Sequence, residues 1–434
     1  MAQTLLLLAA AANNRLLDWL EHHHTTLAGL QLLANAELAR ELAGRPALAP
    51  LLQLEPADLG SLAGGADIRA AALALDGRAA AVMAFADPHA PAALQPDLAL
   101  LARACSVADI PLALNPSSAD LALRGLQRSR RAYLLFNPVA GNGAADATLL
   151  RIRSLLEPQL QLEVMLTQAN GDPAEQTREL IETIRTRHTN QACEAMVVAC
   201  GGDGTVSAVA GALVGTDIPL GVIPCGTANA FAAALAIPTD LAAACAVLLA
   251  GASRRIDTAL CNGSPMVLLA GLGFEAGMVN RTNRELKTRF GALAYVLAGA
   301  QQLLSQQPFS ARLTIDGSTQ ELEAAAITVA NVAPNTSVLA QGFGAVVPDD
   351  GLLEVTVATP TSRLQGLNAL AALMTSAVVQ TPSSHPDLLC LRAREIQIAT
   401  DTPQQLVVDG EMVTASRVTI RSCPGALRVI TPVG

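Results

Sequence analysis

A glycine-rich loop between a strand-like run and a helix-like run is the feature that most restricts the fold of this sequence. The run at residues 195–199 is apolar, and Gly201, Gly202 and Gly204 surround Asp203 directly after it. Glycines have no side chain, so backbone N–H groups there can come close to a phosphate group. Asp203 cannot itself bind phosphate, and we expect it to hold Mg²⁺ or to orient a nucleotide. The loop predicts an α/β nucleotide-binding domain.

Two further loops of the same kind argue against a purely structural role for these glycines. Residues 134–136 read as a buried strand that ends at Asn137, with Gly141 close behind it. Residues 220–224 form another strand-like run before Gly226-Thr227-Ala228-Asn229. A single loop of this type is as often a tight connection as a ligand site. Three such loops at the carboxyl ends of strands predict a ligand-binding edge of an open sheet.

Composition excludes several classes of protein. The chain has 434 residues, enough for about three domains, and it is 51% hydrophobic with a net charge of −9. Only 2% of the residues are aromatic, so we expect no nucleic-acid partner, because stacking platforms for single strands are aromatic. Lys287 is the only lysine, and no Gly-Lys-Ser/Thr sequence is present, which excludes a Walker-type P-loop.

The cysteines and the start of the chain bear on its compartment. Eight cysteines are scattered without a Cys-x-x-Cys pair, which predicts reduced thiols in the cytoplasm rather than a zinc ribbon or a redox dithiol. The apolar start lacks a basic region, so we expect neither a cleavable signal nor a membrane span. His22, His23 and His24 point in different directions on a helix, and we interpret them as a polar helix end.

With motifs nearer the carboxyl terminus, the three loops resemble the catalytic domain of the diacylglycerol kinase family. This family includes bacterial lipid kinases, sphingosine kinases and, more distantly, NAD kinases. The resemblance covers roughly residues 131–434. The motifs that carry it are Asn137-Pro138, residues 201–205, residues 226–229, residues 348–353 and Asp409-Gly410-Glu411. It implies an α/β nucleotide-binding domain at residues 131–257 and a β-sandwich domain at residues 258–434, facing each other across a cleft.

Apolar patterns predict the elements of these two domains. We expect helices at residues 145–156 and 173–187, and short strands separated by turns throughout the second domain. The expected strands of the antiparallel sandwich are 266–270, 311–315, 323–332, 352–358, 395–399, 405–408, 417–421 and 427–430.

The resemblance implies a role for each candidate site residue. Phosphoryl transfer needs a cradle for the nucleotide phosphates, Mg²⁺ and a carboxylate that accepts the proton of the acceptor hydroxyl. By resemblance the nucleotide is ATP, Glu411 is the proton acceptor, and Asp409 and Asp203 bind or orient metal and substrate. A structural Mg²⁺ is implied at the Asp350 carboxylate and the Leu352 carbonyl. The implied nucleotide-binding residues are Asn137, Gly141, Thr167, Gly202, Asp203, Gly204, Thr205 and Thr227.

Simpler interpretations of these residues remain open. Asp350 and Asp409 each precede a glycine, a sequence that is also typical of an ordinary β-turn. Thr167 is marked only by its position at the end of a strand. Three residues differ from the Asn, Glu and Asp that the bacterial lipid kinases carry. They are Ser207, Ala208 and Ala230. An active site with impaired activity is therefore an alternative that remains open.

A lipid acceptor implies a peripheral position at the inner face of the membrane. The basic segment 280–290 stands out in an acidic protein, and each basic residue near an anionic surface adds about 1 kcal/mol of attraction. We expect transient membrane docking there, although such a run is also typical of a solvated helix face. An open sheet edge in either α/β domain predicts a possible homodimer.

Residues 1–128 alternate strand and helix patterns, which predicts a doubly wound parallel sheet, and the polar residues 128–131 predict a linker after it. The expected strands are 5–8, 80–85 and 110–114, and the expected helices are 16–27 and 98–105.

This segment resembles methylglyoxal synthase, an α/β enzyme that eliminates phosphate from dihydroxyacetone phosphate. Asp67 and Asp97 match functional aspartates of that family, whereas Ala9, Ala10 and Asn13 replace its His-Asp pair and phosphate-binding lysine. Each lost charge-assisted contact costs about 1.5–3 kcal/mol, so we expect an inactive domain.

The sequence as a whole predicts an ATP- and Mg²⁺-dependent lipid kinase that phosphorylates a hydroxyl of diacylglycerol or a related lipid. One alternative is methylglyoxal synthesis by the N-terminal domain. Another is a regulatory protein that binds a nucleotide or a metabolite without turnover, which the departures at residues 207, 208 and 230 favour. NAD kinase activity is a weaker alternative, because the Asp409-Gly410-Glu411 ending fits the lipid kinases better.

Overall fold

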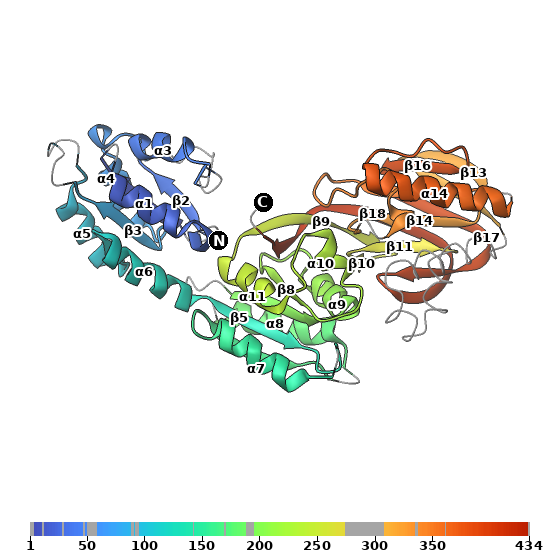
Figure 1. Cartoon of the computed structure of the whole chain (residues 1–434), viewed down its shortest axis with the longest axis horizontal. Helices are drawn as coiled ribbons and strands as arrows, with labels where there is room; N and C mark the ends of the chain where they lie inside the picture. Colours follow the sequence, from blue (N-terminus) through green and yellow to red (C-terminus); the bar gives the residue numbers. More distant parts are fainter. Residues whose placement is uncertain are drawn as a thin grey trace.

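The computed structural model describes the chain except for residues 1–3, 11–12, 28–29, 47, 50–58, 88–90, 92–94, 142, 169–170, 188–194, 274–307, 335–336, 361 and 433–434. The predicted basic docking segment 280–290 therefore lies outside the described residues. Figure 1 shows three successive parts, an N-terminal domain in blue, a central domain in green and a C-terminal β-rich domain in orange and red. Among the helices that the structure describes, none has the length and apolar character needed to cross a bilayer.

The N-terminal domain is a parallel sheet with the strand order β2-β1-β3-β4. The leucine run of β1 is buried on both faces, as in a central strand of a parallel sheet. Leu5 and Leu7 pack in one core with α1, α3 and α6, whereas Leu6 and Leu8 pack in another core with α4 and α5. Helices thus cover both faces, and the prediction of a doubly wound sheet is confirmed. The elements are β1 (Thr4–Ala9), α1 (Asn14–His22), α2 (His24–Leu27), β2 (Gln31–Ala34), α3 (Ala36–Ala43), a 3₁₀ turn (Leu62–Gly64), α4 (Ala66–Leu75), β3 (Ala81–Phe85), α5 (Leu98–Ala108), β4 (Leu112–Ala113) and α6 (Pro116–Ser129).

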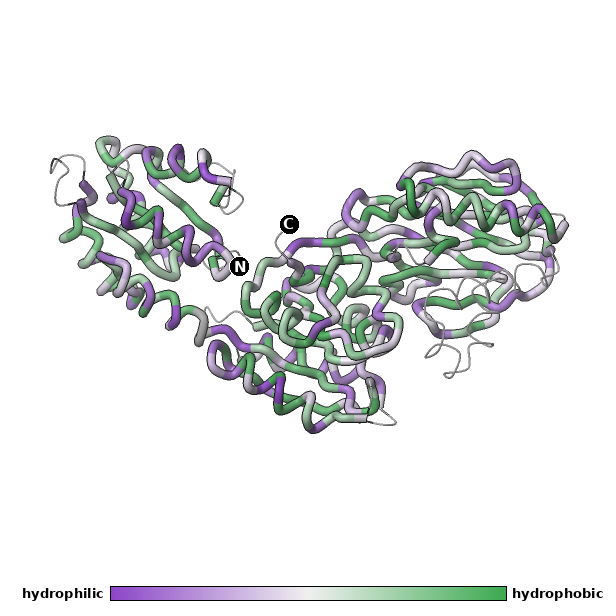
Figure 2. Tube along the Cα trace, in the orientation of Figure 1, coloured by the Kyte–Doolittle hydropathy of each residue, from purple (hydrophilic) through white to green (hydrophobic). Residues whose placement is uncertain are grey.

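The central domain is a second parallel sheet, with the order β6-β5-β7-β8. Its first strand, β5, has β6 on one side and β7 on the other, so the chain reverses its direction of winding between β5 and β7. Tyr133 and Leu135 pack toward α8 and α9, while Leu134 and Phe136 pack toward α7 and α11. Figure 2 shows these strands mostly in the hydrophobic colour. The elements are β5 (Arg131–Phe136), α7 (Ala145–Leu156), β6 (Gln161–Leu166), α8 (Pro173–Arg187), β7 (Ala195–Gly201), α9 (Asp203–Leu213), β8 (Leu220–Pro224), α10 (Ala230–Ala234) and α11 (Leu241–Ala250).

The C-terminal domain is antiparallel, and its prediction as a β-sandwich is confirmed. One long strand, β18, also pairs in parallel with β8, so a continuous sheet runs from the central domain into the C-terminal domain. The elements are β9 (Ser253–Cys261), β10 (Ser264–Met266), β11 (Leu269–Leu272), β12 (Phe309–Ile315), β13 (Ser318–Ala324), β14 (Ala326–Ala330), a 3₁₀ turn (Val338–Ala340), β15 (Leu353–Ala358), α14 (Arg363–Val379), β16 (Leu388–Ala393), β17 (Glu395–Val408) and β18 (Glu411–Ile430).

Several predicted boundaries are wrong. The strands predicted at 395–399 and 405–408 form the single strand β17, and those at 417–421 and 427–430 belong to the single strand β18. The residues between them, including Pro424 and Gly425, make irregularities within the ladder rather than turns, because the partner strand continues past them. The helix predicted at 16–27 is two helices separated at His23, and α14 was not predicted.

The junctions between the domains also differ from the sequence interpretation. The linker predicted at 128–131 is instead the end of α6 and the start of β5. In Figure 1, α6 leads directly from the N-terminal domain toward the central sheet. Strand β9 runs through residue 257, the predicted boundary between the second and third domains.

Candidate active site

The glycine loops lie at the carboxyl ends of β5, β7 and β8, which meet at one edge of the parallel sheet. Asn137, after β5, donates from Nδ2 to Oγ1 of Thr205 in α9 at 2.9 Å, and its backbone N–H donates to the Cys200 carbonyl at 2.9 Å. These bonds join the loops on the two sides of the point where the winding reverses. A crevice at that point is where open α/β sheets bind ligands. The predicted ligand-binding edge is formed.

Two of the loops approach so closely that only glycine fits between them. A Cβ atom placed on Gly226 would lie 2.7 Å from Cα of Gly202 and 2.9 Å from Oδ1 of Asn229. Asn229 has a left-handed backbone, with φ of 48°, and its side chain both accepts from the Gly226 N–H and donates to the Gly226 carbonyl. The Cys225 N–H donates to the Gly201 carbonyl at 2.8 Å. The glycines therefore let the backbones of the two loops pack directly against each other.

Helix α9 begins at Asp203, directly after Gly202. The first N–H groups of a helix have no partners within the helix, and they attract anions. Asp203 Oδ1 accepts from the Phe231 N–H of α10 at 3.3 Å, which fixes the carboxylate beside these amides. No other atom comes within 4 Å of a Cβ built on Gly204, so the first turn of α9 is open at that position. The arrangement suits a phosphate group together with its Mg²⁺.

The structure brings the remaining predicted nucleotide-binding residues to the same edge. Thr167 is buried at the end of β6, where its N–H donates to the Phe136 carbonyl at 2.9 Å. Gly141 has a positive φ of 85°, and a Cβ there would lie 3.3 Å from the Cys225 carbonyl, so its loop packs on the loop after β8. Thr227 is exposed in that loop.

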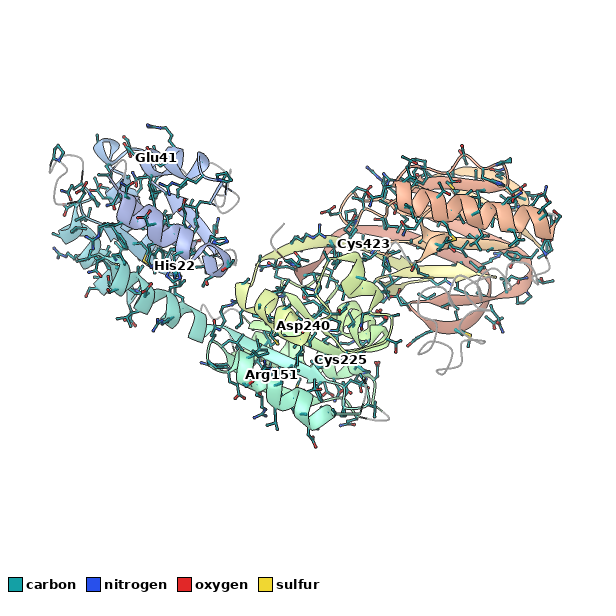
Figure 3. All side chains as sticks on the ribbon, in the orientation of Figure 1. His22, Glu41, Arg151, Cys225, Asp240 and Cys423 are labelled. Atoms are coloured by element: carbon teal, nitrogen blue, oxygen red, sulfur yellow. The ribbon has the colours of Figure 1, made fainter. Side chains whose placement is uncertain are left out.

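A pair of thiols lies beneath the loops. Sγ of Cys200 and Sγ of Cys225 are 3.4 Å apart, and Figure 3 labels Cys225 inside the central domain. The hydrogen bond between the two thiols lowers the pKa of Cys225, because the Cys200 thiol stabilises the Cys225 thiolate, and it raises the pKa of Cys200. The cysteines that the structure describes are all free, as predicted.

The Asp409-Gly410 turn joins β17 to β18 and is held against the central domain. Both residues have positive φ, 50° and 93°, as a two-residue hairpin requires. The Asp409 carboxylate accepts from the N–H groups of Val267, Leu268 and Leu269 at 2.6, 2.8 and 3.0 Å. Burial raises the pKa of Asp409, the three N–H groups lower it, and the charge of Glu411 raises it, so that the pKa lies at about 6.

Glu411 follows this turn as the first residue of β18, and its side chain is exposed. Val267 and Leu268, which bind Asp409, belong to the same hydrophobic core as Val206 and Val209 of α9. One core therefore connects the hairpin with the helix that starts at Asp203. The Glu411 side chain is therefore exposed to solvent, whereas the Asp409 carboxylate holds the turn.

Two polar residues of this region were not predicted. Asp257 is buried in β9, and its carboxylate accepts from the N–H groups of Gly351 and Gly425 at 2.6 and 2.7 Å. Asn331 is also buried and donates to the carbonyls of Asp257 and Val267 at 2.9 and 2.8 Å. They connect the loop of the predicted Mg²⁺ site with the segment that holds Asp409. No local sequence pattern marks either residue.

The predicted structural Mg²⁺ site does not fit the residues that the structure places there. One oxygen of Asp350 accepts from the Leu352 N–H at 3.0 Å, and the other lies 3.4 Å from the Arg392 guanidinium. Arg392 also lies 3.0 Å from the buried carboxylate of Glu354 and 5.0 Å from the ring centre of Phe343. One guanidinium thus lies against both carboxylates. Within the described part of the chain, no three acidic, histidine or cysteine side chains gather as a metal site.

The polar side chains at the edge of the N-terminal sheet form hydrogen bonds with backbone groups of the domain. Asn13 donates to the Phe85 carbonyl at 3.0 Å, and the buried Asn35 bonds to both backbone groups of Ala9 at 3.0 Å. Asp67 and Asp97 do meet, but Asp67 accepts the Asp97 N–H at 3.0 Å, and Asp97 also caps α5. These described side chains bond to backbone groups of the domain, and its inactivity stays a prediction.

A parallel sheet with three glycine loops at its switch point, continuous with an antiparallel sandwich that carries an acidic hairpin, defines a two-domain kinase fold. Two family models match this part of the chain, the diacylglycerol kinase catalytic domain at residues 131–261 and the YegS C-terminal NAD kinase β-sandwich-like domain at residues 269–431. The chain belongs to the diacylglycerol kinase catalytic domain family.

Relatives agree with this assignment. The uncharacterized protein sll0036 of Synechocystis sp. (strain PCC 6803) is 40% identical over 97% of this chain and 96% of its own length. A diacylglycerol kinase of Staphylococcus aureus is 29% identical over 65% of this chain and 86% of its own length. The similarity to sll0036 extends through the N-terminal domain.

Solved structures show the same fold for the last two domains. The crystal structure of a diacylglycerol kinase from Bacillus anthracis str. Sterne aligns with a TM-score of 0.53 and 21% identity, over 70% of this chain and 97% of that chain. A methylglyoxal synthase from Elizabethkingia anophelis covers 28% of this chain with a TM-score of only 0.25. That score carries no argument, so the family of the N-terminal domain stays a prediction from its residues.

Proposed function

We propose that this kinase transfers the γ-phosphate of ATP to the hydroxyl of diacylglycerol or a related lipid. The observation that carries the proposal is the convergence of three glycine loops at the switch point of the central sheet, next to the amino terminus of α9. Backbone N–H groups in such loops bind phosphate oxygens without the lysine of a P-loop. This chain has no lysine in any of the three loops.

The residues present fit a nucleotide with its Mg²⁺ at this edge. A Cβ built on Gly226 would lie only 2.7 Å from Gly202 Cα, so the backbones of the two loops are in direct contact. Because the loops are this close, one phosphate group would contact the backbone of both. Asp203 would hold the metal that accompanies the phosphates, and such a metal neutralises the charge that develops during phosphoryl transfer. Thr167 and Thr227 lie beside the same loops and would contact the nucleotide.

Glu411 is the proposed proton acceptor for the lipid hydroxyl. Its carboxylate is exposed at the start of β18, whereas the carboxylate of Asp409 is used by three N–H groups. The two acids therefore take different roles, with Asp409 positioning the hairpin and Glu411 accepting the proton. A positioned acid or base of this kind typically contributes about 10²- to 10⁴-fold in rate.

The outer face of α14 supports a lipid acceptor. Leu364 and Val378 are 69% and 83% exposed, and no charged residue occurs between them. An uncharged, exposed aliphatic face suits the boundary between headgroups and acyl chains of a bilayer. We therefore place α14 against the membrane during turnover. Leu364→Asp with Val378→Asp should reduce sedimentation with lipid vesicles, whereas Leu150→Asp on the exposed face of α7 should not.

The test is phosphate transfer from labelled ATP, in the presence of Mg²⁺, to mixed micelles that carry diacylglycerol and other lipids with a free hydroxyl. We expect transfer to one lipid class and a loss of at least about 100-fold in Glu411→Gln and in Asp203→Asn. Asp401→Asn, a change of an exposed acid on β17, is the matched control and should leave the rate unchanged. Transfer that persists in Glu411→Gln would refute the assigned role, and ATP binding without transfer to any lipid would favour the regulatory alternative.

A further inference from the structure

A cavity of about 730 Å³ lies where β9, the loop after Val347 and the irregular part of β18 meet. Its lining residues are Arg255, Asp257, Asp349, Asp350, Gly351, Arg394, Glu395, Arg421, Ser422, Pro424 and Gly425. Small-molecule sites are usually about 300–1,000 Å³ in volume. Cys423, which Figure 3 labels, lies in the part of β18 that borders the cavity.

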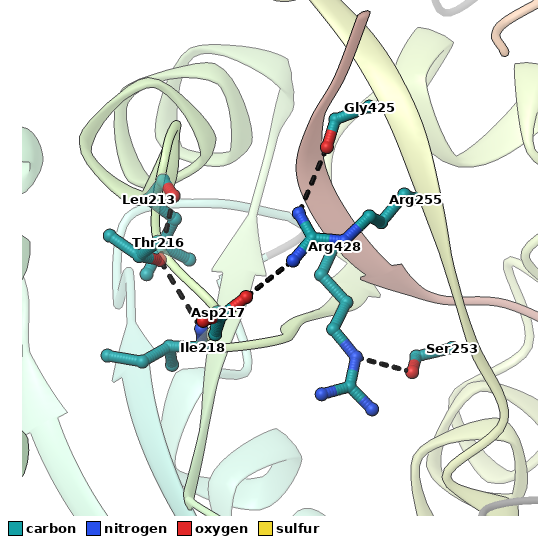
Figure 4. A network of polar contacts seen from close by, with 8 residues as sticks. All are labelled: Leu213, Thr216, Asp217, Ile218, Ser253, Arg255, Gly425 and Arg428. Atoms are coloured by element: carbon teal, nitrogen blue, oxygen red, sulfur yellow. Dashed lines mark hydrogen bonds and ion pairs between the residues drawn. The ribbon is translucent and has the colours of Figure 1, made fainter. Parts of the chain in front are cut away.

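Two of the walls are held in place by Asp257 and Arg255. Asp257 accepts from the N–H groups of Gly351 and Gly425, so one buried carboxylate joins the loop to β18. Arg255 donates to the Gly425 carbonyl at 3.0 Å and forms an ion pair with Asp217 in the loop before β8, as Figure 4 shows. The cavity is therefore shaped by contacts between the central and C-terminal domains.

The other acidic groups of the lining already have partners. Asp349 pairs with Arg254 at 3.3 Å, and Asp350 lies 3.4 Å from Arg392. Glu395 accepts from the Gln397 amide at 2.9 Å. Each of these carboxylates thus has a cation or a hydrogen-bond donor beside it.

Arg394 and Arg421 differ from the other charged groups of the lining. Within the described residues, neither guanidinium has an ion-pair or side-chain hydrogen-bond partner. Arg394 lies in the bend between β16 and β17, and its carbonyl accepts from the Ser422 N–H at 2.8 Å. The next residue, Glu395, pairs with Arg421 in the β17–β18 ladder, so the two arginines lie close together. The hydroxyl of Ser422, the residue after Arg421 in β18, is shielded from solvent and has no hydrogen-bond partner among the described residues.

The geometry points to a binding site for a phosphate-bearing ligand in this cavity, with Arg394 and Arg421 as its cationic contacts and the Ser422 hydroxyl as a further donor. Guanidinium groups bind phosphate oxygens through two parallel N–H groups, and the cavity is large enough for more than a bare phosphate ion. The phosphate could come from a soluble ester or from the headgroup of a phospholipid.

This site is separate from the glycine loops. The β17–β18 ladder runs from the pair Glu395 and Arg421, at the cavity, to the pair Val408 and Glu411, at the candidate active site. The two sites thus occupy opposite ends of one pair of strands. The inference does not depend on the proposed lipid kinase activity.

Isothermal titration of the full chain with inorganic phosphate and with glycerol 3-phosphate tests the inference, with glycerol as the ligand that lacks phosphate. We expect binding of both phosphate compounds and at least a tenfold weaker affinity in Arg394→Ala/Arg421→Ala. Arg417→Ala, on the same strand but outside the cavity, should bind as the wild type does. The single variants Arg394→Gln and Arg421→Gln provide the same comparison if the double variant is unstable.

Sedimentation with phosphatidylcholine vesicles, with and without phosphatidic acid, separates the two sources of phosphate. Arginine-dependent binding only to vesicles with phosphatidic acid would identify a headgroup site, and arginine-dependent binding only of the soluble compounds would identify a metabolite site. Equal phosphate affinity in the wild type and the arginine variants would overturn the inference, because any binding would then occur at the glycine loops. No binding in any arm would overturn it as well.

Discussion

Single residues at the glycine loops differ sharply in how much substitution they can tolerate. A Cβ on Gly226 would meet the backbone of Gly202 at 2.7 Å, whereas a Cβ on Gly204 would meet no atom within 4 Å. Both residues lie in motifs of the same family, so the sequence alone gives them equal weight. The structure makes one a requirement of packing and the other an open position on α9.

We therefore expect Gly226→Ala to push the loops after β7 and β8 apart and to weaken ATP binding at least tenfold. Gly204→Ala is the matched control, since it keeps the backbone N–H and replaces a helical glycine, a change worth about 0.5–1 kcal/mol of stability. Equilibrium binding of a fluorescent ATP analogue measures the first effect, and urea unfolding measures the second. Equal ATP affinity in the two variants would contradict the role given to Gly226.

A second prediction at this scale concerns His23, whose side chain lies 3.0 Å from Asp120 and against the ring of Trp19. Burial lowers the pKa of His23 below 6.5, although Asp120 opposes this shift. The unfolded chain then binds a proton more readily than the folded chain just below pH 6.5. The N-terminal domain should lose stability as the pH falls through that window.

Urea unfolding at pH 5 and pH 7, followed by the fluorescence of Trp19, measures this effect, because Trp19 is the only tryptophan. His23→Gln should have a smaller difference in free energy of unfolding between the two pH values than the wild type. His24→Gln, at an exposed position, should keep the wild-type difference. If the pH dependence of stability is unchanged in His23→Gln, groups other than His23 cause it.

At the scale of elements, the loop before β15 is tied to β16 by charge. Arg392 of β16 is directly opposite Glu354 of β15 in the ladder, and it also reaches Asp350 in the loop. Glu354 is fully buried, and burial raises its pKa to about 7. A buried carboxylate of this kind depends on its cation, so the arrangement has the character of a charge pair rather than a metal site.

Arg392→Met should lower the free energy of unfolding by about 3 kcal/mol, because it leaves Glu354 buried without a cation. The double variant Arg392→Met/Glu354→Met should recover most of that loss, since replacing a whole buried pair by apolar residues is often neutral. Removal of metal with EDTA should leave the wild-type midpoint of unfolding unchanged. A clear fall of the wild-type midpoint in EDTA would show that the loop needs a metal.

At the scale of the whole molecule, the strands of the described residues form two sheets rather than three. The N-terminal domain has its own sheet and its own two cores, and α6 leads from it to the central domain. The central and C-terminal domains share one sheet through the pairing of β18 with β8, and contacts such as the ion pair of Arg255 with Asp217 cross their junction. Cooperative units follow packed cores, so two units are expected.

Thermal or urea unfolding should accordingly show two transitions. Trp19 fluorescence should report only the transition of the N-terminal domain, while far-ultraviolet circular dichroism should report both. Saturating ATP should shift the second transition to higher temperature and leave the first unchanged, because a ligand stabilises only the unit that binds it. A single transition with coincident probes would show that the three domains unfold together.

Local patterns in the sequence determined the parallel sheets, helices α7 and α8, and the glycine loops, because strand and helix periodicity and glycine content act within short segments. The motifs also marked Asp203, Asp409 and Glu411, whose roles stay predictions, but they did not indicate that Asp409 is buried among three N–H groups while Glu411 is exposed. Turn-forming residues misled the prediction within β17 and β18, since Pro and Gly end a strand only when no partner strand continues past them.

Tertiary structure alone decided the rest. Asp257 and Gly425 are far apart in the chain, as are Asn331 and Asp257, and no local pattern records that they meet. The same holds for Arg392, whose guanidinium reaches Asp350 from a strand that is distant in the sequence. A residue's chemistry can be read from its own segment, but its partners, and hence its charge balance and role, are set by which distant segments the fold brings into contact.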